Sequence, residues 1–283
     1  MRTTAVSAEQ AREVDAAPER VWPLLSSPAA WSLRRCSYAF DVLEPSASTR
    51  RLWCWLGPGD AIPTCAVLEI AEEAPGAMIR LRRRDRFPGA EQAFTLSIRP
   101  APRGATARIA VRDVVPRKSK ADWTMRWETD LGLWLDALQA VVEGRRPWPG
   151  PGLPEDVRQA CWAVPAAGSY DSVSATALIR APLDVVWEAV WSPETTRLLD
   201  PAVVASGIVP GTPERAAGEL QYSIRYQADG RITGCVLLVR ELADQHSTLT
   251  ESVSPLHAQV HHLVTPAADG VHLTLTTRWP QNW

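Results

Sequence analysis

The stretch Ala16-Ala17-Pro18-Glu19-Arg20-Val21-Trp22 occurs a second time, in related form, as Ala181-Pro182-Leu183-Asp184-Val185-Val186-Trp187. Trp22 and Trp187 are 165 residues apart, and the Ser-Pro pairs at 27–28 and 192–193 keep the same offset. A strand-like run precedes each copy. In the first copy, Pro18 and Glu19 suit the first turn of a helix, where a missing N–H costs nothing and a negative charge is favourable. The sequence therefore predicts two related domains, each beginning with a strand and a short helix.

Length and composition exclude several classes of protein. The 283 residues are 46% hydrophobic and 22% charged, which is typical of a globular chain long enough for two domains. The net charge of −2 provides no basic field for nucleic acid or an anionic membrane. No apolar run approaches the roughly 18 residues of a membrane span, and no signal-peptide pattern follows Met1. Five cysteines without a Cys-x-x-Cys pair indicate reduced thiols, so we expect a cytoplasmic protein.

The first half of the chain alternates like an antiparallel sheet and then changes to a helical period. Apolar and polar residues alternate in several short runs that glycine and proline pairs separate. The following helix has an apolar stripe at spacings of three and four, made of Trp123, Trp127, Leu131, Trp134, Leu138 and Val141. We expect an α+β domain over residues 1–146, with a curved antiparallel sheet around this long helix.

The second half repeats the strands without the long helix. Residues 147–170 form a linker rich in proline and glycine plus a short helix, and residues 171–283 form the second domain. A sheet without its helix would expose a large apolar face. Three partners can cover it: the segment Leu153–Val164, the first domain, or a second copy of the chain in a homodimer.

These features resemble the START-like, Bet v 1-like helix-grip superfamily (SRPBCC), which includes polyketide cyclases, lipid-transfer domains and relatives of the Hsp90 ATPase activator. The resemblance rests on the strand leading into Asp15–Trp22, on its second copy at Arg180–Trp187, and on the long helix around Trp134 that ends before Gly144. It covers residues 5–146 well and 171–279 less completely. It implies two tandem helix-grip domains with an apolar cavity between sheet and helix, and it carries over no catalytic residue.

Candidate site residues concentrate in the second half, which contains all five histidines. His262 is in phase with apolar residues of its strand, so it is either a buried histidine with one hydrogen bond or a general acid/base facing the cavity. Glu251 lies on a neighbouring strand with the same apolar phase, and it must be paired, raised in pKa or in reach of solvent. Tyr222 and Tyr226 offer hydroxyl donors on a third strand, and Trp187 offers a cavity wall.

Fewer candidates lie in the first half. Asp113 is in phase with the apolar residues of its strand, where we expect it to pair with an arginine or to contact a ligand. Trp127 and Trp134 of the long helix are candidate cavity walls. We expect no metal site, because His261 and His262 point to opposite faces of a strand and only His257 shares a face with His261. We expect no cofactor, since no glycine-rich phosphate loop is present.

Three functions remain open from the sequence. The first is binding of a hydrophobic, polyketide-like or aromatic small molecule in an apolar cavity, with His262 and Glu251 catalysing a cofactor-independent cyclase, aromatase or dehydratase reaction. The second is non-catalytic sequestration of such a compound, as in a resistance protein. The third is an interaction module of the co-chaperone type. The first two predict a small-molecule ligand, and the third predicts a filled core.

Overall fold

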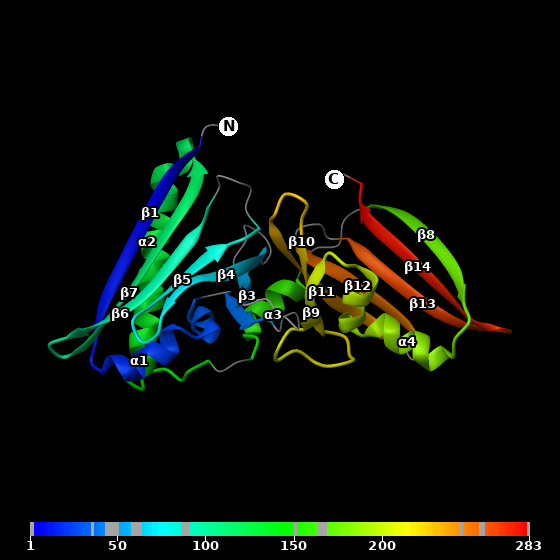
Figure 1. Ribbon diagram of the computed structural model, residues 1–283, viewed down its shortest axis with the longest axis horizontal. Helices are drawn as coiled ribbons and strands as arrows, with labels where there is room; N and C mark the ends of the chain where they lie inside the picture. The colour runs from blue at the N-terminus through cyan, green and yellow to red at the C-terminus, as the bar shows by residue number, and fades with distance from the viewer. Residues whose placement is uncertain are drawn as a thin grey trace. The chain divides into compact units, whose positions relative to one another are not determined.

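The computed structural model describes residues 3–34, 37–42, 51–57, 64–85, 91–149, 152–163, 169–243, 246–254 and 258–281. The chain divides into two compact units. One is built mostly from residues up to Pro154 and the other mostly from Glu155 onward. Each unit contains one seven-stranded antiparallel sheet and a small number of helices, so the fold is α+β with two domains (Figure 1).

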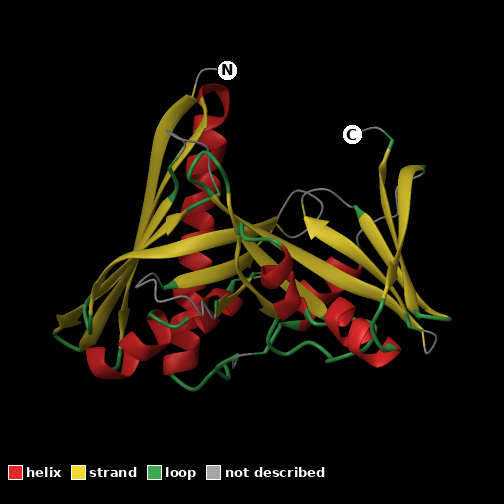
Figure 2. Cartoon of the chain, turned by 45° about the vertical axis from the view of Figure 1, so that its right-hand side comes forward, coloured by secondary structure: helices red, strands yellow, loops and turns green. Residues whose placement is uncertain are grey.

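The first unit contains one sheet and one long helix. Its elements are β1 (Thr3–Val14), α1 (Pro18–Leu25), η1 (Pro28–Leu33), β2 (Tyr38–Asp41), β3 (Leu52–Gly57), β4 (Thr64–Ala74), β5 (Met78–Arg83), β6 (Ala93–Ala101), β7 (Gly104–Pro116), η2 (Arg117–Ser119) and α2 (Lys120–Val142). The strand order is β1-β7-β6-β5-β4-β3-β2, so the first strand pairs with the last and the others follow in sequence. Helix α2 packs against β1 and β7 (Figure 2).

Local sequence explains where the helices begin and end. Pro18 occupies the first turn of α1, and the Ser27 hydroxyl accepts a hydrogen bond from the Ala29 N–H, which caps the 3₁₀ helix η1. At the other end of the unit, Gly144 has a φ of 72° just after α2, and the Arg145 N–H donates to the Ala140 carbonyl. Glycine adopts that left-handed conformation without strain, so the helix ends there.

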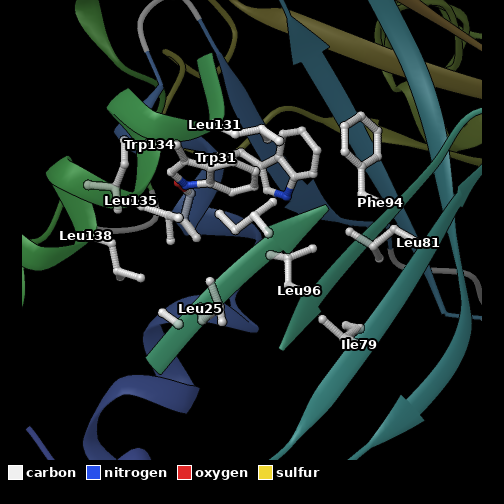
Figure 3. Packing of buried hydrophobic residues seen from close by; sticks show 14 of the residues in the cluster. Leu25, Trp31, Ile79, Leu81, Phe94, Leu96, Leu131, Trp134, Leu135 and Leu138 are labelled. Carbon is white, nitrogen blue, oxygen red and sulfur yellow. The ribbon is translucent and has the colours of Figure 1, made fainter. Parts of the chain in front are cut away.

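The interior between α2 and the sheet is filled with large side chains. Buried residues from α1, η1, β5, β6 and α2 meet there, and Figure 3 shows Trp31 and Trp134 among leucines of the helix and the sheet. Trp31, Trp53, Trp134 and Phe94 are all fully buried. Aromatic side chains therefore occupy much of the space in which the sequence predicted a ligand cavity.

The second unit repeats the order of the first. Its elements are α3 (Glu155–Trp162), β8 (Tyr170–Ile179), α4 (Leu183–Trp191), η3 (Pro193–Thr195), α5 (Thr196–Leu199), β9 (Val203–Ile208), β10 (Leu220–Tyr226), β11 (Ile232–Ala243), β12 (Ser247–Ser254), β13 (Gln259–Ala267) and β14 (Gly270–Pro280). The strand order β8-β14-β13-β12-β11-β10-β9 matches that of the first sheet position by position. The two sheets are thus copies of one topology.

Two strands escaped the sequence analysis. They are β2 and β9, which hold the same edge position in their sheets. Each is short, with four and six residues, and each ends a sheet. A short edge strand pairs on one side only, so its sequence carries little of the alternation that reveals longer strands.

The two units differ in what covers the sheet. In the second unit the described residues after β14 end at Gln281 and contain no counterpart of α2. Strand β8 is exposed along most of its length, including Val173 at 59%. Helix α3 does not replace the missing helix, because it leaves Val173 and Leu275 exposed, although its own Val157 and Cys161 are buried.

Candidate functional site

His262 lies on the face of the second sheet that carries helix α4. It pairs with Thr248 of β12 and Leu275 of β14, and paired residues of antiparallel strands point to the same face. Two residues along β13, Val264 packs against Val186 of α4. We call this side, defined by His262, Val264 and Leu275, the grip face of the second unit. Sequence phase alone correctly placed His262 with the apolar residues of its strand.

The His262 imidazole is half-buried, and its Nδ1 has no hydrogen-bond partner among the described residues. Burial lowers its pKa from the usual value, and the neighbouring His261 lowers it further. The side chain is therefore neutral at pH 7, so its unprotonated nitrogen can accept a proton. Beside it on the grip face, Leu275 remains 37% exposed.

Trp187 belongs to the same face. It packs with Val264 and Val271 in the small apolar cluster under α4, and its ring stacks on Trp191 at 6.1 Å. The His246 ring meets Trp187 edge-on at 5.3 Å, while the His246 carbonyl accepts a hydrogen bond from the Val264 N–H. Trp187 thus packs on the grip face beside Val264.

Glu251 lies on the opposite face from His262. It pairs with Leu238 and Gln259, whereas His262 aligns with Thr248, and the register between β12 and β13 is continuous over these residues. Successive residues of a strand alternate between faces, so the two side chains cannot meet. The expectation that Glu251 and His262 act in one cavity is therefore wrong. The alternation of apolar residues correctly placed each side chain on the apolar side of its own strand. It does not show whether two strands turn these sides toward the same face of the sheet.

Glu251 has a structural partner instead. It is buried, and Arg240 Nε donates to its Oε2 at 2.6 Å. Arg240 also donates through Nη1 to the Trp162 carbonyl at the end of α3, and its guanidinium lies 5.3 Å from the Trp162 ring centre. This ion pair connects α3 to the sheet and satisfies Oε2 of the carboxylate, whereas Oε1 is buried without a hydrogen-bond partner among the described residues.

The two candidate tyrosines also lie away from His262. Tyr222 pairs with Val236 and shares the face of Glu251, where it is buried above Gly207. A side chain on Gly207 would come within 3.0 Å of the Tyr222 hydroxyl, so the glycine makes room for the ring. Tyr226 follows at the end of β10 and is partly exposed. Neither tyrosine can contact a ligand that sits at His262.

In the first unit, Asp113 is fully buried and bonded to an amide. Gln92 Nε2 donates to its Oδ2 at 2.7 Å, and the Val114 N–H donates to its Oδ1 at 2.8 Å. Gln92 in turn accepts from Arg83, whose guanidinium is held by Asp85 at 2.6 and 2.7 Å. Gln92 therefore links Asp113 to Arg83.

Trp127 and Trp134 both point from α2 into the first unit's interior, as the helical stripe predicted. They differ in their hydrogen bonds: Trp134 Nε1 donates to the Ala30 carbonyl at 2.8 Å, while Trp127 Nε1 has no partner among the described residues. The Arg34 guanidinium carbon lies 5.4 Å from the ring centre of Trp127 and 5.8 Å from that of Trp134. The sequence analysis missed Arg34, because no pattern marks a single arginine after a short helix as buried.

A groove of about 680 Å³ crosses the first sheet away from these residues. Its lining includes both charge signs and contains none of the predicted site residues: Ser7, Ala8, Glu9, Glu72, Met78, Arg80, Ala93, Thr95, Ala110, Val111, Arg112 and Glu128. Within the described ranges, no three histidine, cysteine or acidic side chains are placed to hold a metal ion; His257 lies outside those ranges. None of the helices described has both the length and the apolar character of a membrane span.

No protein-family model matches the chain, and no curated protein matches it. Among solved structures, the chain is similar to two di-domain ARO/CYC proteins, StfQ from the steffimycin pathway (11% identity, TM-score 0.35) and BexL from the BE-7585A pathway (16%, 0.36). The alignments cover 99% of this chain and 84% and 85% of those chains. Protein SA2116 of unknown function from Staphylococcus aureus aligns with 50% of this chain over 96% of its own (9%, 0.41).

The fold assignment rests on the structure itself rather than on these distant likenesses. In both units the first strand pairs with the last, and in the first unit the long helix α2 packs across that pair. The two units thus share one α+β topology, and among the described residues only the first has a long helix across its sheet.

Proposed function

We propose that the second unit binds a hydrophobic, flat small molecule on its grip face, with His262 next to the ligand's polar atoms. The observation that carries this proposal is an uncovered apolar surface with one neutral imidazole on it. Val173 and Leu275 are 59% and 37% exposed beside His262, where the first unit has α2 over its sheet. Strands β13, β14 and β8 together span roughly 10 Å, which suits an aromatic or polyketide-like ring system.

The neutral state of His262 indicates which proton transfers it can catalyse on a ligand. A neutral imidazole at pH 7 accepts a proton from an enolisable carbon, and the imidazolium so formed can return that proton to an oxygen of the ligand, which are steps that a cyclase or dehydratase needs. The apolar surface would hold the substrate in one orientation. In this proposal His262 is the catalytic group, and Glu251, Tyr222 and Tyr226 have structural roles.

The test is a titration of the whole chain with emodin, a flat aromatic polyketide. Quenching of tryptophan fluorescence reports the binding. We expect saturable binding that Leu275→Lys weakens by about tenfold or more, because a charge replaces apolar contact area. Leu178→Lys is the matched control: Leu178 is 47% exposed on β8, the edge strand next to β14, but it pairs with His272 on the opposite face. Equal effects of the two variants would contradict the proposal.

A second candidate, sequestration without turnover, is favoured by one observation. Glu251, the acid expected to assist His262, lies on the other face in an ion pair with Arg240. The two candidates separate on His262→Ala. If the chain is an enzyme, this variant abolishes the bell-shaped pH profile of product formation; if it sequesters, emodin binds without any product and the variant changes the affinity only slightly.

A further inference from the structure

Strand β8 forms a free edge of the second sheet. It is hydrogen-bonded to β14 on one side, and none of the described strands pairs with its other side (Figure 1). Its pairing with β14 continues over all 10 residues of the strand without a bulge. Every residue from Asp171 to Leu178 is exposed. The strand is therefore long, regular and uncovered on both faces.

The main-chain hydrogen bonds show which groups of β8 point away from the sheet. Just beyond the strand, the Gln281 N–H donates to the Ser169 carbonyl at 3.2 Å, in the same register as the β8–β14 pair. In an antiparallel pair only every second residue bonds to the neighbouring strand, so the odd-numbered residues of β8 bond to β14. The N–H and C=O groups of the even-numbered residues point outward, and these residues are Tyr170, Ser172, Ser174, Thr176 and Leu178.

Strand β1 holds the same position in the first sheet, but its sequence protects it against pairing with another strand. It carries the charged residues Glu9, Arg12 and Glu13, and helix α2 packs against it. Charges on an edge strand oppose the approach of a second strand, because the contact would bury them. The sequence from 172 to 179 in β8 contains neither a charged residue nor a proline. Strand β8 therefore lacks the features that keep edge strands unpaired.

We propose that β8 pairs edge to edge with the β8 strand of a second copy of this chain, in antiparallel direction and around a two-fold axis. The outward groups of the two strands then form about eight main-chain hydrogen bonds. Such a contact is closed, because each copy uses its free β8 edge in the same contact, and the product is a dimer. The contact lies at the edge of the sheet and covers neither grip face, so it does not depend on the function proposed for that face.

The side chains of β8 favour a second copy over an unrelated strand. Paired residues of antiparallel strands point to the same face, so the apolar residues of the two copies align on one face and the hydroxyls on the other. Within the sheet, the hydroxyls of Ser174 and Thr276 lie 2.8 Å apart, and those of Thr176 and Thr274 lie 2.9 Å apart. An axis at Ala175 places Ser174 opposite Thr176 of the second copy, which continues this row of hydroxyl pairs across the contact.

Sedimentation of the whole chain at rising concentration tests the proposal. We expect the wild type to form a dimer and Thr176→Pro to weaken it by about tenfold or more, because proline removes an outward N–H and its ring obstructs the edge. The monomer should stay folded in this variant, since the Thr176 N–H does not bond to β14. Thr176→Val is the matched control: it loses the same hydroxyl but keeps the N–H, and it should weaken the dimer severalfold at most.

Amide hydrogen exchange is the second measurement, and it decides if Thr176→Pro fails to fold. In the monomer the N–H groups of Ala175 and Ala177 bond to β14, whereas those of Ser174 and Thr176 face water. As the concentration rises, exchange at Ser174 and Thr176 should slow by about tenfold or more. Emodin should leave the dimer intact, because the edge is not the grip face. The proposal is overturned if the wild type stays monomeric up to millimolar concentration, if exchange at Ser174 and Thr176 does not depend on concentration, if Thr176→Pro dimerises as the wild type does, or if emodin dissociates the dimer.

Discussion

His262 couples the stability of the protein to pH. Its pKa is lowered in the folded state by burial first and by His261 second, whereas an unfolded chain has the usual value of about 6.5. As the pH falls through that value, the unfolded chain takes up a proton that the folded chain still excludes. The free energy of unfolding therefore decreases as the pH falls from about 6.5 toward the lowered pKa, and it is recovered above.

This dependence should disappear in His262→Leu. Urea unfolding at pH 7.5 and pH 5.5 should show a loss of stability for the wild type at the lower pH, and a smaller loss for the variant. His272→Leu is the control, since His272 is exposed on the adjacent strand and faces away from the grip face. An identical pH dependence in wild type and His262→Leu would contradict the lowered pKa.

Single residues also show where sequence reasoning stops. The alternation of β7 predicted that Asp113 points inward, and it does so with no exposed surface. The identity of its partner was not predictable, because Gln92 precedes β6 and carries no apolar phase of its own. Arg34 was missed for the same reason. Both depend on contacts between distant segments, and a strand pattern describes only one segment at a time.

At the scale of elements, the repeat extends to a pair of glycines at the start of the last strands. Gly104 opens β7 with a φ of 130°, and Gly270 opens β14 with a φ of 145°. A side chain on Gly104 would lie 2.7 Å from the Ala16 nitrogen, and one on Gly270 would lie 2.9 Å from the Arg180 Cα. In each unit the glycine lets the last strand pass the end of the first strand, just before the repeated stretch.

Alanine at either glycine should therefore destabilise its unit. We expect Gly104→Ala and Gly270→Ala each to lower the free energy of unfolding by about 2 kcal/mol or more, because strained backbone and a backbone clash add. Gly132→Ala is the opposite control: Gly132 lies inside α2, an added Cβ would meet no atom within 4 Å, and the change should raise stability by about 1 kcal/mol. Chemical denaturation of the three variants provides the test. If alanine at Gly104 and at Gly270 leaves the free energy of unfolding unchanged, the proposed shared role of the two glycines is wrong.

The order of elements was largely predictable, since long alternating strands and the 23-residue helix α2 have strong periods. The assembly of a site was not. Phase assigned Glu251, Tyr222 and His262 to apolar faces, but a sheet buried on both faces has two of them. Only the register between β12 and β13 shows that Glu251 and His262 are opposed. That register depends on pairing between strands, which no single strand encodes.

At the scale of the whole molecule, the two units share a strand order and differ in cover. Helix α2 covers the first sheet with Leu131, Leu135 and Leu138. In the second unit, strand β8, which holds the position of β1, remains exposed on both faces. Large exposed apolar patches on proteins usually mark binding surfaces. A homodimer, which the sequence analysis offered as one possible cover, and the proposed small-molecule ligand would compete for the same grip face.

Self-association measures that competition. If a second copy covers the grip face, the wild type should sediment faster as its concentration rises, and Val173→Lys should weaken the dimer by about tenfold or more, because burying an unpaired charge opposes the contact. Leu178→Lys, on the same strand but the opposite face, should associate as the wild type does. Emodin should then dissociate the dimer, since one surface cannot hold both. A wild type that stays monomeric at all concentrations, with emodin bound, would assign the grip face to the ligand alone.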